Sequence, residues 1–153
     1  TILQQLQRVV PNDPLSQLLH RTDVAATMDV RVVRVPILLD ADDLEPLLEF
    51  TPTWCLVERD GQDLYLVQGS ELLAWLREAL SDSETADLAQ ATIRRWTIAP
   101  VPLQASLRQA MDTIRASTSE AVCVYERSRA TGKQILHGVV TRVSIEKFTL
   151  DRL

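Results

Sequence analysis

The sequence predicts an α+β fold, close to α/β, in which two β-α-β-β-α repeats pack about a pseudo-twofold axis behind an N-terminal helical lead-in. Two short stretches nearly repeat each other, Cys-Leu-Val-Glu-Arg at 55–59 and Cys-Val-Tyr-Glu-Arg at 123–127, and a turn and a second apolar run follow each of them. The order of strand-like and helix-like patterns is also the same in both halves. Repeats of this size bury their apolar faces against each other, so we expect function where the two copies meet.

Composition excludes several classes of protein. With 153 residues and 46% hydrophobic content, the chain has enough apolar side chains for a substantial core. The net charge of -5, with arginines scattered among acidic neighbours, leaves no basic face for nucleic acid. No apolar stretch reaches the roughly 18 to 20 residues of a membrane helix, so we expect no direct membrane insertion of this piece.

Four segments follow from the patterns along the chain. They are a lead-in over 1–27, a first repeat over 28–80, a polar and acidic linker over 81–91, and a second repeat over 92–153. In the first repeat, Val alternates with Arg31 and Arg34, which is the period of a half-buried strand. Strands at 54–58 and 64–67 form a hairpin around the turn that contains Gly61.

Two helices complete the first repeat. The first is predicted with Asp43 as its cap and Pro46 in its first turn, where proline is tolerated. The second is predicted to begin at the cap Ser70. Apolar residues recur at helical spacing in both, at Leu44, Leu47 and Leu48 in the first and at Leu72, Trp75, Leu76, Ala79 and Leu80 in the second.

The second repeat shows the same order. A short strand is predicted at 96–98, and a helix follows whose cap Ser106 has Gln109 three residues on, the spacing of a capping box. A hairpin over 121–125 and 135–140 precedes the last helix. The core positions of the two helices are Leu107, Ala110, Met111, Ile114, Ile145 and Phe148.

This order, with the residues at its joints, resembles a tandem pair of CBS domains, the regulatory unit called a Bateman module. The helix entry at 102–111 is similar to the family's proline followed by "SLxxAL". The stretch Gly-Val-Val-Thr-Arg-Val-Ser at 138–144 is similar to its glycine, two apolar residues, threonine, two residues and aspartate. The resemblance covers about residues 29–150. The lead-in through Pro36 further resembles the cytoplasmic tail of prokaryotic ClC-type chloride channels and transporters.

The resemblance implies a binding module for an adenine nucleotide such as AMP, ADP or ATP, in clefts between the copies. In the second repeat it implies ligand-binding roles for Gly138, Thr141, Arg142 and Ser144. The threonine hydroxyl would lie near ribose and phosphate, at a helix N-terminus that favours an anion. The family's aspartate accepts two bonds from the ribose, whereas Ser144 replaces it here. Losing a carboxylate contact lowers affinity by about tenfold to a hundredfold.

The first repeat departs further from the family pattern. Tyr65 stands at the glycine position, Gln68 at the threonine and Glu71 at the aspartate. Of the two implied ligand contacts, Gln68 and Glu71, only the carboxylate keeps the family's chemistry, and the Tyr65 side chain fills space that a ligand would enter. Both copies place a cysteine, Cys55 and Cys123, where the family commonly has a proline that borders the adenine.

Each of these residues also has a purely structural interpretation. Thr141 and Ser144 are good helix caps without any ligand, and Glu71 in a first helical turn interacts favourably with the helix dipole. The two cysteines are expected to be reduced core side chains, and His137 within an apolar strand is expected to be structural. Trp54, Trp75 and Trp96 are core or interface anchors, although one of them could stack on adenine.

Two classes of function remain open, and neither is enzymatic, since no nucleophile with a base, metal cluster or carboxylate pair stands at a recognisable spacing. The first is a regulatory module that senses an adenine nucleotide and belongs to a chloride channel or other ion transporter of the same polypeptide. The second is a ligand-free structural module for dimerisation. Both predict a homodimer, with no cofactor and no metal. The chain begins at Thr1 without Met, which we interpret as a cytoplasmic piece of an inner-membrane protein.

Overall fold

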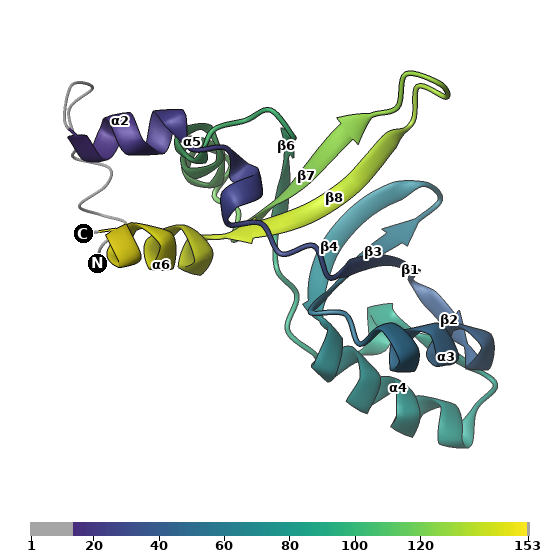
Figure 1. Ribbon diagram of the computed structural model, residues 1–153. Helices are drawn as coiled ribbons and strands as arrows, with labels where there is room; N and C mark the ends of the chain where they lie inside the picture. Colours follow the sequence, from purple (N-terminus) through teal and green to yellow (C-terminus); the bar gives the residue numbers. More distant parts are fainter. Residues whose placement is uncertain (1–13, 153) are drawn as a thin grey trace. The chain divides into compact units, whose positions relative to one another are not determined.

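The computed structural model of the chain describes residues 14–152, which form two compact units (Figure 1). The first-repeat unit is Arg31–Thr97. The second-repeat unit combines the described residues up to Val30 with those from Ile98 onward. The lead-in therefore belongs to the same compact unit as the second repeat. Over residues 14–152, no helix has the length and apolar character needed to cross a membrane.

The first-repeat unit has a three-stranded sheet in the order β1-β3-β4, with β1 parallel to β3 and β3 antiparallel to β4. Asp60 and Gly61 both have positive φ, which makes the tight turn between β3 and β4. A separate pair, β2 and β5, is antiparallel. The elements are β1 Val32–Pro36, β2 Leu38–Asp40, α3 Ala41–Phe50, β3 Trp54–Arg59, β4 Gln62–Gln68, α4 Gly69–Asp82 and β5 Thr85–Asp87.

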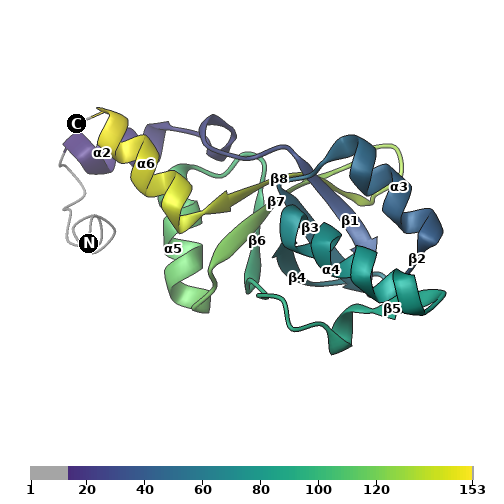
Figure 2. The same cartoon turned by 90° about the horizontal axis from the view of Figure 1, so that it is seen from below.

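The second-repeat unit has the same order without counterparts of β2 and β5 in its described residues, and it adds the lead-in helix. Its sheet runs β6-β7-β8, again with one parallel and one antiparallel pair. Figure 2 shows α2 and α6 at the far end of this unit from the turn between β7 and β8. The elements are α2 Pro14–Arg21, β6 Ile98–Pro102, α5 Leu107–Ser117, β7 Ala121–Arg127, β8 Gln134–Thr141 and α6 Arg142–Arg152. The predicted strand-helix-strand-strand-helix order is thus confirmed in both repeats.

Each unit has its own hydrophobic core between its sheet and its helices. In the first-repeat unit, Leu72 and Leu76 of α4 pack with Val57 and Val67 of the sheet, all fully buried. In the second, Leu19 of the lead-in joins the core residues that the sequence predicted on α5 and α6. Those residues are Leu107, Ala110, Met111, Ile114, Ile145 and Phe148. The predicted stripes on α5 and α6 are therefore buried within their unit, and Leu47, Leu72 and Leu76 are buried in theirs, whereas Leu48 of the predicted α3 stripe is exposed.

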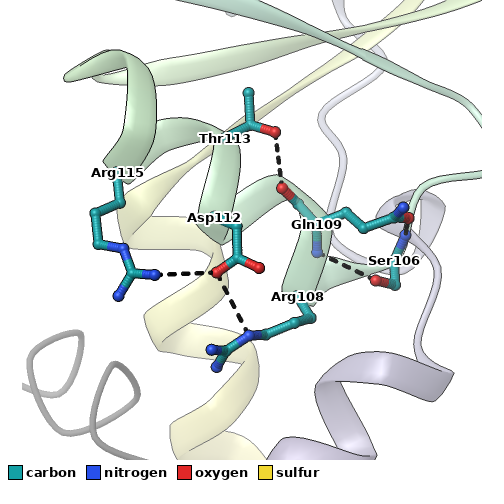
Figure 3. A network of polar contacts seen from close by, with 6 residues as sticks. All are labelled: Ser106, Arg108, Gln109, Asp112, Thr113 and Arg115. Atoms are coloured by element: carbon teal, nitrogen blue, oxygen red, sulfur yellow. Dashed lines mark hydrogen bonds and ion pairs between the residues drawn. The ribbon is translucent and has the colours of Figure 1, made fainter.

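Helix α5 begins as its sequence predicted. The Ser106 hydroxyl accepts a hydrogen bond from the Gln109 amide at 3.1 Å, and the Gln109 side chain accepts one from the Ser106 amide at 2.8 Å. Figure 3 shows this capping box beside an ion-pair network, in which Asp112 lies 3.4 Å from Arg108 and 3.6 Å from Arg115. These charges occupy the polar face of α5, opposite its core residues.

The starts of the two helices in the first repeat were predicted wrongly. Helix α3 is capped by Asp40, whose side chain accepts hydrogen bonds from the amides of Asp42 and Asp43. The Asp43 side chain in turn accepts a hydrogen bond from the Asp40 amide. Asp43 is therefore the third helical residue, and Pro46 lies in the second turn. Helix α4 begins at Gly69, and Gln68, not Ser70, precedes it without a side-chain cap. An added Cβ at Gly69 would lie 1.9 Å from the Pro52 carbonyl oxygen.

Two strands also differ from the prediction. The first strand of the second repeat is Ile98–Pro102, not 96–98, because Trp96 pairs instead with Leu66 of the first-repeat unit. The predicted linker over 81–91 contains β5, which pairs with β2. Strand β6 is an edge strand that carries Pro100 and Pro102.

The strand register shows that the two near-identical sequence stretches occupy positions in their respective sheets that differ by one residue. Trp54 pairs with Gln68 and Ala121 with Thr141, and in each case the second residue ends its strand. Cys55 therefore occupies the position of Val122, and both face the helices of their unit. Cys123 lies on the opposite face, because successive side chains of a strand alternate. The two cysteines are both buried and free, but they are not equivalent.

Candidate functional site

The predicted ligand residues of the second repeat lie where β8 passes into α6. Thr141 is the last residue of β8, and Ser144 is in the first turn of α6. The Thr141 hydroxyl accepts a bond from the Ser144 amide at 3.1 Å, and the Ser144 hydroxyl accepts one from the Thr141 amide at 2.9 Å. The Ser144 hydroxyl also donates to the Thr141 carbonyl at 2.8 Å. The pair is a reciprocal helix cap, the structural role that the sequence offered as an alternative.

This cap leaves limited hydrogen-bonding capacity for a ligand. Each hydroxyl has one donor and two acceptor sites. Ser144 uses its donor and both acceptor sites locally, since the Thr141 hydroxyl also donates to its oxygen at 3.4 Å, and Thr141 uses its donor and one acceptor site. A ligand hydroxyl or amide is therefore able to donate to the Thr141 oxygen without breaking the cap, whereas the Ser144 hydroxyl has no hydrogen-bonding site left. Arg142, the first residue of α6, is exposed.

Gly138 has a structural reason to be glycine. It is buried in β8 opposite Val124, and a Cβ there would lie 2.4 Å from Cγ of Met28 and 2.8 Å from the Asp29 carbonyl oxygen. Asp29 forms a two-bond bridge with Val139, with both bonds near 3 Å. The segment before β1 thus lies directly on β8, and this close approach excludes a side chain at Gly138.

The equivalent positions of the first repeat lie where β4 passes into α4. Tyr65 pairs with Val57 as Gly138 pairs with Val124, and Gln68 and Glu71 take the places of Thr141 and Ser144. Tyr65 is buried in the core of its unit, and burial raises the pKa of its phenol while the nearby Arg95 and Arg59 oppose that effect. Glu71 accepts a long bond of 3.4 Å from the Arg94 amide.

A segment of the chain also covers this first-repeat position. Trp96 exchanges two main-chain bonds with Leu66, of 3.0 and 2.8 Å. Its ring meets Trp54 edge-on, with the centroids 5.0 Å apart, and the Arg94 guanidinium stacks on the Trp96 ring, 3.6 Å from its centroid. The bridge from Trp96 to Leu66 is the counterpart of that from Asp29 to Val139. The tryptophans are thus packed against protein groups, as the sequence favoured.

Each unit contains a hollow beside the helix that follows its hairpin. In the second-repeat unit it measures about 280 Å³ and lies between α6 and the segment around Thr27. In the first-repeat unit it measures about 670 Å³ and lies between α4 and the segment around Arg94. The helix positions match, at Ser144, Lys147, Phe148 and Asp151 in one and at Glu71, Ala74, Trp75 and Glu78 in the other. We call them the α6 hollow and the α4 hollow.

The α6 hollow contains Ser144 and the α4 hollow contains Glu71, so each includes one predicted ligand residue. The sequence did not reveal the other wall of either hollow. Thr27 and Arg94 precede the strands β1 and β6 by a few residues, and only the bridges to Val139 and Leu66 bring their segments to the helices. The available signal was similar spacing, since Thr27 precedes β1 by five residues and Arg94 precedes the equivalent strand β6 by four.

His137 lies apart from these sites, in the hairpin of the second repeat. Its Nε2 is 3.2 Å from a carboxylate oxygen of Glu126 on the neighbouring strand. Val124 pairs with Gly138 and Tyr125 pairs with Leu136, so His137 is the unpaired extra residue of a β-bulge in β8. This contact gives His137 the structural role that its sequence context favoured.

No protein-family model and no curated protein matches the sequence. Solved structures with a similar fold include CBS domains. A CBS domain of a putative transporter from Clostridium difficile 630 has a TM-score of 0.56 at 16% identity, over 88% of this chain and 98% of that one. The CBS domain of a bacterial CNNM/CorC family Mg²⁺ transporter in complex with ATP has a TM-score of 0.53 at 16% identity, over 89% and 92%.

A third similar structure is a CBS-domain pair from Klebsiella pneumoniae with bound AMP. Its TM-score is 0.50 at 18% identity, over 85% of this chain and 99% of that one. At such identities the likeness concerns the fold. The chain therefore has the fold of a CBS-domain pair, as its duplicated motif order predicted.

Proposed function

We propose that this chain is a cytoplasmic regulatory module of a membrane transport protein, which senses an adenine nucleotide or a related ligand. The observation that carries the proposal is the second-repeat joint, where Thr141 and Ser144 lie at the start of α6 beside the α6 hollow. The fold adds support, because CBS domains of similar structure have been solved with ATP and with AMP.

The ligand acts by binding one arrangement of the two units more tightly than another. A ligand shifts such an equilibrium only by its difference in affinity for the two arrangements. Thr141 accepts a hydrogen bond from the ribose, Ser144 holds Thr141 in place as its cap partner, and Arg142 faces the phosphate. Because a serine hydroxyl replaces the family's carboxylate, we expect binding in the micromolar to millimolar range, typical of a metabolite sensor.

We further propose a ClC-type chloride channel or transporter as the parent protein. Support comes from the lead-in, whose Pro11, Leu15, Leu18 and Leu19 are followed by the stretch Met-Asp-Val-Arg-Val-Val-Arg-Val-Pro at 28–36. Similar structures include CBS domains of a different transporter family, the CNNM/CorC Mg²⁺ transporters. The parent polypeptide decides between them: a chloride-channel membrane region ahead of Thr1 supports our proposal, and a CNNM/CorC membrane region contradicts it.

The alternative function is a ligand-free module that holds two subunits together. The closed cap between Thr141 and Ser144 and the buried Tyr65 at the glycine position favour it. Under this alternative the chain has the same fold and the same dimer, but adenine nucleotides do not bind.

Isothermal titration calorimetry and thermal unfolding with AMP, ADP and ATP separate the two functions. A bound ligand stabilises the folded state by mass action, by about 2.7 kcal/mol at a hundred times its Kd. Thr141→Ala is expected to weaken binding at least tenfold. Ser106→Ala is the matched control, because it removes a helix cap of the same kind from α5. Absence of stabilisation at millimolar nucleotide would remove the sensing function, and equal binding by both variants would remove the site.

A further inference from the structure

The two hollows occupy equivalent positions but differ in charge. The α6 hollow is lined by Lys147, Arg152 and Asp151, which leaves one net positive charge. The α4 hollow is lined by Glu71, Glu78 and Arg94, which leaves one net negative charge. The same architecture therefore presents opposite signs to a ligand in the two repeats.

The two positively charged side chains of the α6 hollow differ in whether another side chain contacts the charged group. Lys147 is exposed, and its ammonium group has no hydrogen bond or ion pair with any residue over 14–152. The Arg152 guanidinium stacks on the Phe148 ring, 4.0 Å from its centroid. Lys147 is thus the cation available to a ligand, while Arg152 raises the local potential.

The opposite wall of the α6 hollow carries a polar group without a partner. The Thr27 hydroxyl oxygen is buried and makes no hydrogen bond within the described part of the chain. A buried hydroxyl in this state is destabilising by about 1–3 kcal/mol, so a ligand that reaches it binds more favourably. Ser144 lines the same hollow, but its hydroxyl is fully engaged in the cap with Thr141.

In the α4 hollow the corresponding groups do not favour an anion. Glu71 replaces Ser144, Ala74 replaces Lys147, and Arg94 in the place of Thr27 is stacked on Trp96. An anion there would lie close to two carboxylates, well within the screening distance of about 8 Å at physiological salt.

We propose that the α6 hollow binds a phosphate-bearing group through Lys147 and the Thr27 hydroxyl, and that the α4 hollow binds none, so that each chain takes one such ligand. The volume of about 280 Å³ suits a phosphate or ribose phosphate, at the lower end of small-molecule sites. This inference rests on the proposed function and assigns the ligand's charged end to residues outside the family motif.

Calorimetry of the chain with inorganic pyrophosphate and with AMP tests the proposal. We expect one ligand per chain, with binding weakened on the order of tenfold by Lys147→Ala, as for the loss of one charge-assisted contact. Lys133→Ala is the matched control, because Lys133 is the other lysine of the sequence and lies in the turn between β7 and β8. The variant Glu78→Gln, which changes the charge of the α4 hollow, is expected to bind as the wild type does.

Equal affinity of the two lysine variants, two ligands per chain, or no binding of either probe would overturn the proposal. Titration with adenosine distinguishes a failure of the phosphate-site proposal from a failure of the proposed nucleotide-sensing function. If adenosine binds and pyrophosphate does not, the phosphate site is wrong and nucleoside sensing stands. If Lys147-dependent binding is the same for pyrophosphate and AMP, and adenosine does not bind, the phosphate site stands and adenine recognition is wrong.

Discussion

Gly69 shows how one residue fixes the start of a helix. It follows β4 directly and begins α4, and its backbone lies against the Pro52 carbonyl. We expect Gly69→Ala to lower the free energy of unfolding by about 3 kcal/mol, because the backbone must move to make room for a methyl group. Urea denaturation monitored by circular dichroism measures this loss.

Gly132→Ala provides the comparison for that variant. Gly132 has a φ of 71°, but a Cβ there would meet no atom within 4 Å. We expect it to cost about 1 kcal/mol, from the left-handed backbone conformation alone. If the two variants are equally stable, steric crowding at Gly69 is not what requires glycine.

Cys55 predicts how stability depends on alkaline pH. Burial raises the pKa of its thiol from 9.0 to about 12. Between these values the folded protein keeps a proton that the unfolded chain loses, so the free energy of unfolding falls as pH rises, by up to about 1.4 kcal/mol per unit. In Cys55→Ala we expect a shallower decline between pH 9 and 10.5 in urea titrations. Identical slopes for the variant and the wild type would contradict a buried, protonated thiol.

At the residue scale, the sequence predicted which residues lie at the junctions between strand and helix, but not which other side chains lie near them. Thr141, Ser144 and Glu71 were predicted at the helix starts, and they lie there because strand ends and helix caps are local features. Thr27 and Lys147 were not predicted as site residues. Their proximity depends on the bridge between Asp29 and Val139, a contact between distant parts of the chain that no local pattern encodes.

Among the elements, helix starts show the limits of local patterns. Asp40 and Asp43 stand three residues apart, and either is a good cap by residue type. The structure selects Asp40 because β2, which the sequence did not reveal, ends there. Strands β2 and β5 have three residues each, too few for an alternating pattern to stand out.

The capping box of α5 supplies a prediction for a single helix. Ser106→Ala removes the side chain that accepts the Gln109 amide, so we expect a loss of about 1 kcal/mol in the free energy of unfolding. Ser106→Asp keeps an acceptor at that position and should retain most of the stability. Thermal and urea unfolding of both variants measure the difference, and an equal loss in both would show that capping is not the cause.

At the scale of the whole molecule, duplication was the most informative feature of the sequence. It predicted the element order of both units, because each copy had to supply its own sheet and helices. Matching the two cysteine-containing stretches letter by letter misaligns the two strands by one residue. A shift of one residue along a strand puts every side chain on the opposite face of the sheet. Burial on both faces of these strands removed the alternation that would have shown the slip.

The predicted homodimer also belongs to this scale. The helix faces at Leu72–Leu80 and Leu107–Ile114, which the sequence offered for contact with a second subunit, have their central residues buried in the cores of the two units. A dimer must therefore use other surfaces, and Val143 and Leu150 of α6 are among the large apolar residues that stay exposed. We expect sedimentation at high concentration to give twice the mass of 17.2 kDa. A strictly monomeric species there would contradict the dimer.

The two prolines of β6 have a consequence for how this protein behaves in a crowded cell. The Leu103 amide donates to Tyr125 of β7, so the alternate positions 100 and 102 point outward, and proline has no amide hydrogen to offer there. A strand of another molecule that docked on this edge would find no amide donors for its carbonyl groups at positions 100 and 102. The sheet therefore resists growth from one side into the stacked, fibre-like assemblies that open edges promote.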